Sequence, residues 1–208
     1  MESIREFFGI QLRRSFQPII SALRWLKISP NQVTIMGTVL NLAAAALVVA
    51  TSLTHHLIYA GIVFLVAGCF DMLDGALARL AQKVTPFGAF LDSTLDRVSE
   101  GVIFAAIGYL LAVDGRSVDV ALVVLALLGS ILVSYTRARA EALGVECKVG
   151  LMSRPERVIL IAIGLFFNVL PYVIYIMLAL TAFTVIQRVV HTYRQLSKQR
   201  KQGGFVER

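Results

Sequence analysis

The chain has 208 residues, of which 57% are hydrophobic, and its mean hydropathy is +0.76. This composition excludes an ordinary soluble domain and predicts one membrane domain built from helices, because a bilayer forces backbone groups to bond within their own segment. The net charge of +7 would suit nucleic acid, but the basic residues lie between apolar spans and not in stripes with aromatic residues. We therefore expect membrane lipids and phosphorylated substrates as partners, and no nucleic acid.

Residues 1–28 are expected to form a juxtamembrane amphipathic helix. They combine arginines with apolar residues that include Trp25, a mixture typical of a helix that lies in the membrane interface. The arginines of this segment are expected to contact lipid headgroups.

The first two membrane spans are predicted from residues 31–70, which contain no Asp, Glu, Lys or Arg. A polar segment at residues 51–56 divides this stretch into two spans of about 20 residues each, the length that a bilayer requires. Ser29 or Asn31 can cap the first helix, and Pro30 suits its first turn.

Two further spans follow a tight turn that Pro86 and Gly88 indicate. The third span is expected to start near Asp92 and to end at Asp114, before a short loop. The fourth span covers residues 120–136, which are uncharged, and leads into a group of basic residues.

The last uncharged stretch, residues 158–187, contains the fifth and sixth spans, which Asn168 and Pro171 separate. The predicted fold class is therefore an all-α integral membrane protein with six transmembrane helices and the amphipathic helix at its N-terminus. The six helices fall within residues 29–195, and residues 196–208 form a polar basic tail.

Six spans put both ends of the chain on the same side of the membrane. Of the 20 basic residues, only Arg116 falls in a loop assigned to the far side. The positive-inside rule then predicts a multi-pass protein of the cell (inner) membrane, with both termini in the cytoplasm. Runs of small residues at 43–46 and 101–108 permit close packing between helices, and a homodimer is expected.

Four aspartates stand where the second span ends and the third begins. At about 100° per residue, Asp71 and Asp74 share one face of a helix, and Asp92 and Asp96 share a face of the next. Such acids repel one another unless cations neutralise them, and hard divalent cations prefer carboxylate oxygen. Two such ions could clamp a phosphate, with the acids at the cytoplasmic end of the spans. Small residues beside the acids would leave room for a bulky substrate: Gly75, Ala78 and Gly88.

The residues from Asp71 to Asp96 match the pattern D-x2-D-G-x2-A-R-x8-G-x3-D-x3-D at every fixed position. This pattern resembles the signature of the CDP-alcohol phosphotransferase family, integral membrane enzymes that make phospholipids. The resemblance covers about residues 27–194. It implies two divalent cations, Mg²⁺ or Mn²⁺, and a CDP-diacylglycerol-like donor attacked at its β-phosphorus by an alcohol, with CMP as the leaving group.

The resemblance also implies a role for individual residues. The four aspartates would ligate the metal ions, and Asp96 would also be the general base that takes the proton of the attacking hydroxyl. Arg79 would pair with the diphosphate of the donor, and Gly75 and Ala78 would let the nucleotide approach the helix. Other positions match CDP-binding positions of the family: Asn31, Gln32, Thr34 and Thr85.

Arginines at the cytoplasmic ends of the last three spans are candidates for binding a phosphorylated acceptor. They are Arg137, Arg154, Arg157 and Arg188. The set resembles that of family members whose acceptor is inositol phosphate, although those members typically carry lysine at the position of Arg137. The charge survives this exchange, but the geometry of a guanidinium differs from that of an ammonium group.

Three alternatives remain open from the sequence. The acceptor could be glycerol phosphate. Alternatively, the donor could be an archaeal ether lipid whose group is transferred to inositol phosphate. An arginine pocket does not separate these cases, because each acceptor carries a phosphate. The remaining alternative is a small cation transporter whose carboxylates line an ion path. Transport predicts acids spread through the depth of the membrane, whereas these acids lie within 26 residues at one end of two spans.

Overall fold

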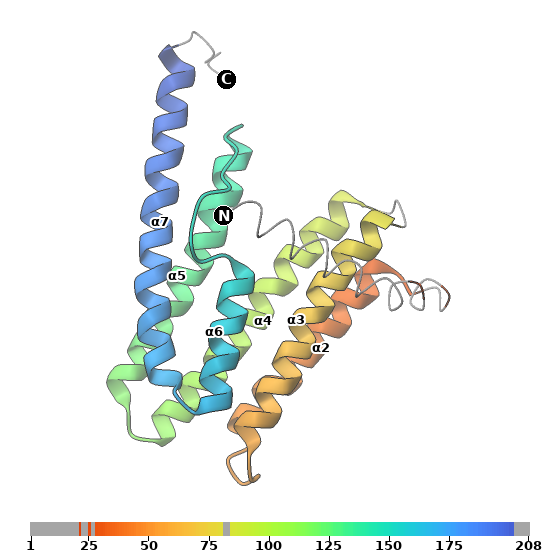
Figure 1. Cartoon of the computed structure of the whole chain (residues 1–208), viewed down its shortest axis with the longest axis vertical. Coiled ribbons are helices and arrows are strands. Elements are labelled where there is room, and N and C mark those ends of the chain that lie inside the picture. The colour runs from red at the N-terminus through yellow and green to blue at the C-terminus, as the bar shows by residue number, and fades with distance from the viewer. Residues whose placement is uncertain (1–20, 22–24, 26–27, 81–83, 202–208) are drawn as a thin grey trace.

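The computed structural model describes residues 21, 25, 28–80 and 84–201. These residues form six helices and no strand (Figure 1). The helices are α2 (Pro30–Val49), α3 (His56–Leu80), α4 (Pro86–Val113), α5 (Ser117–Ala142), α6 (Arg154–Phe167) and α7 (Leu170–Lys201). The predicted amphipathic helix at 1–28 lies outside the described residues, apart from three positions.

The first helix begins where the sequence predicts. Ser29 is the N-cap of α2, its hydroxyl accepts the Gln32 N–H at 3.3 Å, and the Gln32 side chain accepts the Ser29 N–H at 2.8 Å. This reciprocal capping box satisfies backbone donors that the helix itself leaves open. Pro30 occupies the first turn, where its missing N–H costs nothing.

The predicted start of the third span near Asp92 is wrong, because α4 begins at Pro86. Pro86 and Gly88 lie in the first helical turn and do not form a separate tight turn. Thr85 caps the helix, and its hydroxyl accepts the Gly88 N–H at 3.0 Å. A proline is well suited to a first turn, so the feature that suggested a turn is part of a helix start.

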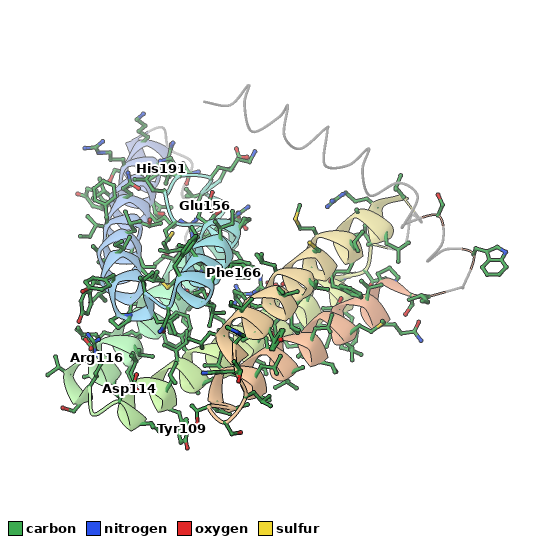
Figure 2. All side chains as sticks on the ribbon, turned by 60° about the horizontal axis from the view of Figure 1, so that its bottom comes forward. Tyr109, Asp114, Arg116, Glu156, Phe166 and His191 are labelled. Carbon is green, nitrogen blue, oxygen red and sulfur yellow. The ribbon has the colours of Figure 1, made fainter. Side chains whose placement is uncertain are left out.

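Consecutive helices run in alternating directions (Figure 1). The connections from α2 to α3, from α4 to α5 and from α6 to α7 lie at the bottom of this view. In Figure 2, Asp114 and Arg116 accordingly lie at the opposite end of the molecule from Glu156 and His191. The helix α7 continues to Lys201, six residues into the predicted tail.

The helices pack in two groups that share one apolar core. Helix α2 packs against both α3 and α4, and α7 packs against α5 and α6. The contacts of α3 with α6 and of α4 with α5 join the groups, and one cluster of buried residues draws on all six helices. Ala44 and Ala45, from a run of small residues that suggested close packing, are buried in this core.

Four helices are long and apolar enough to cross a membrane: α2, α3, α5 and α7. The other two fall short for different reasons. Helix α4 carries four charged residues, and α6 has 14 residues, a length of roughly 21 Å against a hydrocarbon core of about 30 Å. The chain is thus a multi-pass, all-helical membrane protein over its described residues, and the crossing of α4 and α6 remains a prediction.

Candidate active site

The four aspartates lie on two helices that α2 holds side by side. Asp71 and Asp74 belong to α3, and Asp92 and Asp96 belong to α4. Asp74 is 5% exposed, and the side chains of Asp71 and Asp96 are each 16% exposed. Acids buried to this degree must be compensated by positive charge or by hydrogen-bond donors.

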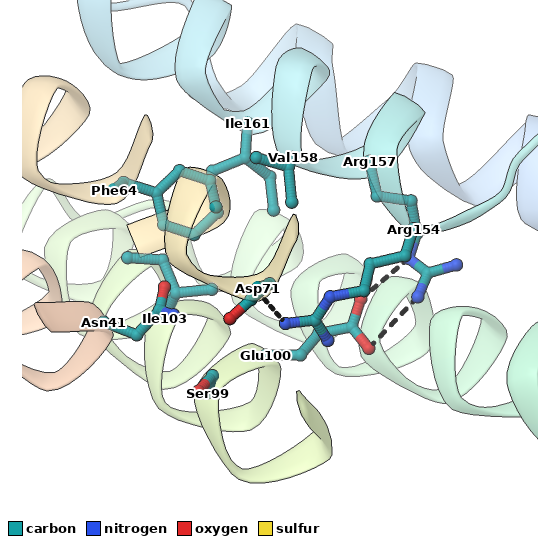
Figure 3. Close-up of a pocket in the computed structure, with 11 residues that line it drawn as sticks. Asn41, Phe64, Asp71, Ser99, Glu100, Ile103, Arg154, Arg157, Val158 and Ile161 are labelled. Carbon is teal, nitrogen blue, oxygen red and sulfur yellow. Dashed lines mark hydrogen bonds and ion pairs between the residues drawn. The ribbon is translucent and has the colours of Figure 1, made fainter. Parts of the chain in front are cut away.

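Arg154, the first residue of α6, supplies positive charge to two of these acids. Its Nη2 lies 2.5 Å from Asp71 Oδ2, a contact drawn in Figure 3, and 2.8 Å from Asp96 Oδ1. One nitrogen therefore bridges carboxylates of α3 and α4. We expected Arg154 to bind the acceptor phosphate. In the structure its guanidinium lies on the aspartates, and its contact with the acceptor phosphate stays a prediction.

Thr34 supplies the donor for Asp74. Its hydroxyl donates to Asp74 Oδ2 at 2.7 Å, and the Gly75 N–H donates to Asp74 Oδ1 at 2.5 Å. The sequence led us to expect that Thr34 contacts the nucleotide. In the structure the Thr34 hydroxyl orients Asp74, one of the predicted metal ligands. Hydrogen bonds of this kind hold a metal ligand in position.

Gly37 allows α2 to approach Asp71 closely. A Cβ atom at this position would lie 2.9 Å from Asp71 Oδ1 and 3.3 Å from the Cβ of Phe70. Any larger residue would therefore displace either the carboxylate or the helix. Gly37 could not be predicted as part of the site, because nothing along the chain relates it to Asp71.

A pocket of about 310 Å³ with both polar and apolar lining residues lies between α2, α3 and α4, and we call it the α2–α4 pocket. Asp74 and Asp92 line it together with most of the residues predicted to contact the CDP-lipid. These residues are Asn31, Thr34, Gly75, Ala78, Arg79 and Thr85. Gln32 differs from them, since it is exposed and its side chain serves the capping box.

A second, mostly apolar hollow of about 380 Å³ lies beside α3 and α6, and we call it the lateral groove. Asp71, Asp92, Asp96 and Arg154 line it on one side. Its remaining lining is largely apolar: Leu65, Gly68, Cys69, Met72, Pro155, Val158 and Ile159. Asp92 lines both hollows, so a single molecule could reach past the acids from the more polar hollow into the more apolar one.

Arg157 lies one turn beyond Arg154 and is bound to Glu100 of α4. Arg157 Nε lies 2.7 Å from Glu100 Oε1 (Figure 3). Ser130 of α5 donates to the same oxygen at 2.5 Å. Arg157 is only 2% exposed, so its guanidinium is committed to this pair. Arg157 thus holds α6 against α4, and the acceptor contact that the sequence suggested for it stays a prediction.

Glu100 was not predicted, although the sequence carries a signal for it. Glu100 follows Asp96 by four residues, as Asp96 follows Asp92, so it extends the acidic face of α4 by one turn. A small cavity of about 20 Å³, large enough for one water molecule, lies between Glu100, Arg157, Arg154 and Asp71. The two arginine–carboxylate pairs are therefore neighbours.

Of the other two predicted acceptor ligands, Arg137 lies near the C-terminal end of α5 and Arg188 lies in the middle of α7. Arg137 is half-exposed and pairs with Glu141 at 2.8 Å. Arg188 is 4% exposed, and it donates to the carbonyls of Val149, at 2.9 Å, and of Val133. Val133 lies one turn before Arg137, so α7 is fastened to α5 close to Arg137.

The donor set suits a hard divalent cation, although the acids are not arranged as a finished metal site. Among the residues that the structure describes, no three acidic, histidine or cysteine side chains are close enough to hold one ion. The guanidinium that bridges Asp71 and Asp96 shows, however, that these carboxylates accommodate a positive charge between them. Carboxylate oxygens are also the ligands that Mg²⁺ and Mn²⁺ prefer.

Comparison with known proteins gives consistent matches over most of the chain. A family model described as CDP-alcohol phosphatidyltransferase matches residues 27–188. A phosphatidylinositol phosphate synthase of Corynebacterium glutamicum is 38% identical over 182 residues, 84% of this chain and 82% of the relative. An archaetidylinositol phosphate synthase of Methanothermobacter thermautotrophicus is 36% identical over 201 residues, 94% of this chain and 97% of the relative.

Solved structures of the Mycobacterium tuberculosis phosphatidylinositol phosphate synthase have the same fold. The structure with CDP-DAG bound has a TM-score of 0.76 at 31% identity and covers 86% of this chain and 94% of its own. The structure in complex with manganese and citrate has a TM-score of 0.74 at 31% identity, covering 85% of this chain and 88% of its own.

Proposed function

Because this chain belongs to the CDP-alcohol phosphatidyltransferase family, we propose that it transfers a phosphatidyl group from CDP-diacylglycerol to inositol phosphate and releases CMP. The observation that carries this proposal is the arrangement of the two hollows around the acids. A lipid joined to a nucleotide needs a polar compartment and an apolar one on either side of its diphosphate. The α2–α4 pocket offers charged and hydrogen-bonding side chains, the lateral groove is mostly apolar, and Asp92 lines both.

The aspartates are proposed to hold two divalent cations, Mg²⁺ or Mn²⁺, and the manganese complex of the mycobacterial enzyme supports the use of a divalent metal. Asp71, Asp74, Asp92 and Asp96 are the proposed ligands. Bound ions of this kind polarise a phosphoryl group and offset its negative charge. The enzyme is thus a metal-dependent transferase.

The remaining residues of the α2–α4 pocket bind and orient the donor. The side chain of Arg79 lies back over Gly75, because a Cβ atom added at Gly75 would lie 3.6 Å from Arg79 Nη1. A diphosphate in the pocket would therefore meet a guanidinium fork beside an open stretch of helix. Asn31 and Thr85, on facing helix starts, would border the nucleotide.

Asp96 is the proposed general base. It would accept the hydroxyl proton of the acceptor while the hydroxyl oxygen forms a bond to the β-phosphorus of the donor. The bond from that phosphorus to the oxygen it shares with CMP breaks, and CMP leaves with the electron pair. Arg154, with Arg137 and Arg188, is proposed to bind the phosphate of the acceptor.

The acceptor assignment is tested with a panel of alcohols. The purified enzyme, supplied with CDP-diacylglycerol and Mg²⁺ or Mn²⁺, is expected to release CMP with inositol phosphate and not with serine. Product formation with glycerol phosphate alone would replace inositol phosphate as the acceptor. The similarity to the archaeal enzyme favours inositol phosphate but leaves the donor tails open, so the panel is repeated with an ether-linked CDP-lipid.

We also infer the arrangement of the chain in the membrane. All six helices are proposed to cross the cell membrane, with residues 29–195 as the catalytic domain and the acids facing the cytoplasm. Residues 1–28 would lie in the interface, and 196–208 would form a basic tail. The enzyme is proposed to act as a homodimer, which cross-linking in native membranes would test.

Thr34→Val is expected to weaken metal binding about 10- to 100-fold, because Asp74 loses the donor that orients it. The affinity for Mn²⁺ is measured by electron paramagnetic resonance, and the metal dependence of CMP release is measured alongside. Thr38→Val is the matched control, since the Thr38 hydroxyl donates only to the backbone carbonyl of Thr34, at 3.1 Å. Equal Mn²⁺ affinities in the two variants would show that the hydrogen bond from Thr34 to Asp74 does not strengthen metal binding.

A further inference from the structure

Arg154 occupies carboxylate oxygens that the proposed function assigns to metal ions. Its Nη2 is within hydrogen-bonding distance of Asp71 Oδ2 and Asp96 Oδ1 at the same time. Mg²⁺ binds carboxylate oxygens at about 2.0–2.1 Å and allows little distortion of its octahedron. A guanidinium nitrogen on these two oxygens and a metal ion bound by them therefore compete for the same space and the same charge.

The surroundings of Arg154 allow its side chain to leave while the helix stays in place. Helix α6 is fixed to α4 by the buried pair of Arg157 and Glu100, one turn further along. Arg154 itself stands at the first position of α6, and its side chain is 26% exposed and lines the lateral groove. Rotation about side-chain bonds alone can move its guanidinium away from the aspartates.

A released Arg154 is a strong ligand for phosphate. Guanidinium groups form paired, charge-assisted hydrogen bonds with phosphate oxygens, and the carboxylates would then be free to bind cations. Conversely, an acceptor phosphate that captures Arg154 exposes both carboxylates. We propose that Arg154 exchanges between the aspartates and the acceptor phosphate, and thereby couples the binding of metal to the binding of acceptor.

This inference rests on the proposed function for the binding of metal by the aspartates and for the nature of the acceptor. Its thermodynamic consequence is reciprocal, because a ligand that raises the affinity for a second ligand must have its own affinity raised by the same factor. The exchange makes Arg154 a positioning residue that also keeps the aspartates compensated when no metal is bound. Bound acceptor should therefore tighten metal binding, and removal of the guanidinium should do the same without acceptor.

The test measures Mn²⁺ binding to the full chain in detergent by electron paramagnetic resonance. In the wild type, inositol phosphate is expected to lower the Mn²⁺ dissociation constant about fivefold or more, and inositol without phosphate is expected to leave it unchanged. Arg154→Gln is expected to bind Mn²⁺ more tightly than the wild type, with no further effect of inositol phosphate. Arg194→Gln removes an exposed charge from α7 and is expected to behave as the wild type.

Two results would overturn the exchange. One is a wild-type Mn²⁺ affinity that inositol phosphate leaves unchanged although CMP is released with that acceptor. The other is an Arg154→Gln variant that binds Mn²⁺ no more tightly than the wild type. CMP release by the wild type separates this test from that of the acceptor: if only glycerol phosphate yields product, the titrations are repeated with it, and the comparison without acceptor decides alone.

Discussion

Replacement of Asp96 by asparagine is expected to lower CMP release by about 10²- to 10⁴-fold, the usual contribution of a general base. Asparagine has nearly the same shape but cannot accept the proton of the attacking hydroxyl. Asp96 belongs to α4, and its Oδ1 lies 2.8 Å from the guanidinium of Arg154. The substitution therefore removes a negative charge at the centre of the site. CMP release is measured with saturating donor and acceptor, and Mn²⁺ binding is measured in parallel.

The parallel measurement distinguishes a lost base from a lost metal site. We expect Mn²⁺ binding to be retained in part, because three of the four proposed ligands remain. Asp114→Asn is the matched control, since Asp114 is an exposed acid that caps the opposite end of the same helix. Full turnover by the Asp96→Asn enzyme would end the assignment of Asp96 as the base.

Arg157→Met is expected to lower the free energy of unfolding by about 3–5 kcal/mol, because it leaves the Glu100 carboxylate buried without its partner. Arg157 is 2% exposed, and the side chain of Glu100 is 9% exposed. Unfolding is followed in mixed detergent micelles with increasing denaturing detergent. The double variant Arg157→Met with Glu100→Met is expected to recover most of the loss, since neither charge is then left buried.

The exposed pair of Arg137 and Glu141 offers a contrast of the same residue types. Its two side chains are 48% and 45% exposed, so Arg137→Met is expected to cost at most about 1 kcal/mol. If the two arginine substitutions had equal effects on unfolding, the pair of Arg157 and Glu100 would not be what holds α6 against α4.

The features predictable from the sequence are those that local spacing determines. Uncharged runs predict the helices because the membrane excludes charge, and Ser29 was recognisable as a cap because a proline follows it. The four aspartates stood out because their period places them on helix faces. The start of α4 was missed because Pro86 suits both a turn and the first turn of a helix, and only the Thr85 cap distinguishes the two.

The features that the sequence did not disclose are contacts between distant positions. Arg154 meets Asp71 across 83 positions, and Arg157 meets Glu100 across 57. The residue types show that these side chains are charged, but the rotation of α6 relative to α3 and α4 cannot be inferred from a single sequence. The arginines of α6 therefore resembled one phosphate-binding set, whereas the fold divides them between the acids and the core.

If α6 crosses the membrane as proposed, its short length sets the depth of the proposed site. If the turn at its far end marks one edge of the hydrocarbon, its 14 residues place Arg154 roughly 9 Å short of the other edge. Asp71 lies 15 residues beyond the start of α3, which is on the side where α6 ends. It is therefore at a similar level, roughly 22 Å from the edge on that side. Any tilt of the helices lowers both further. The catalytic groups are then sunk beneath the plane of the headgroups, so the water-soluble acceptor must descend to the lipid, and the lipid need not be lifted out of its leaflet.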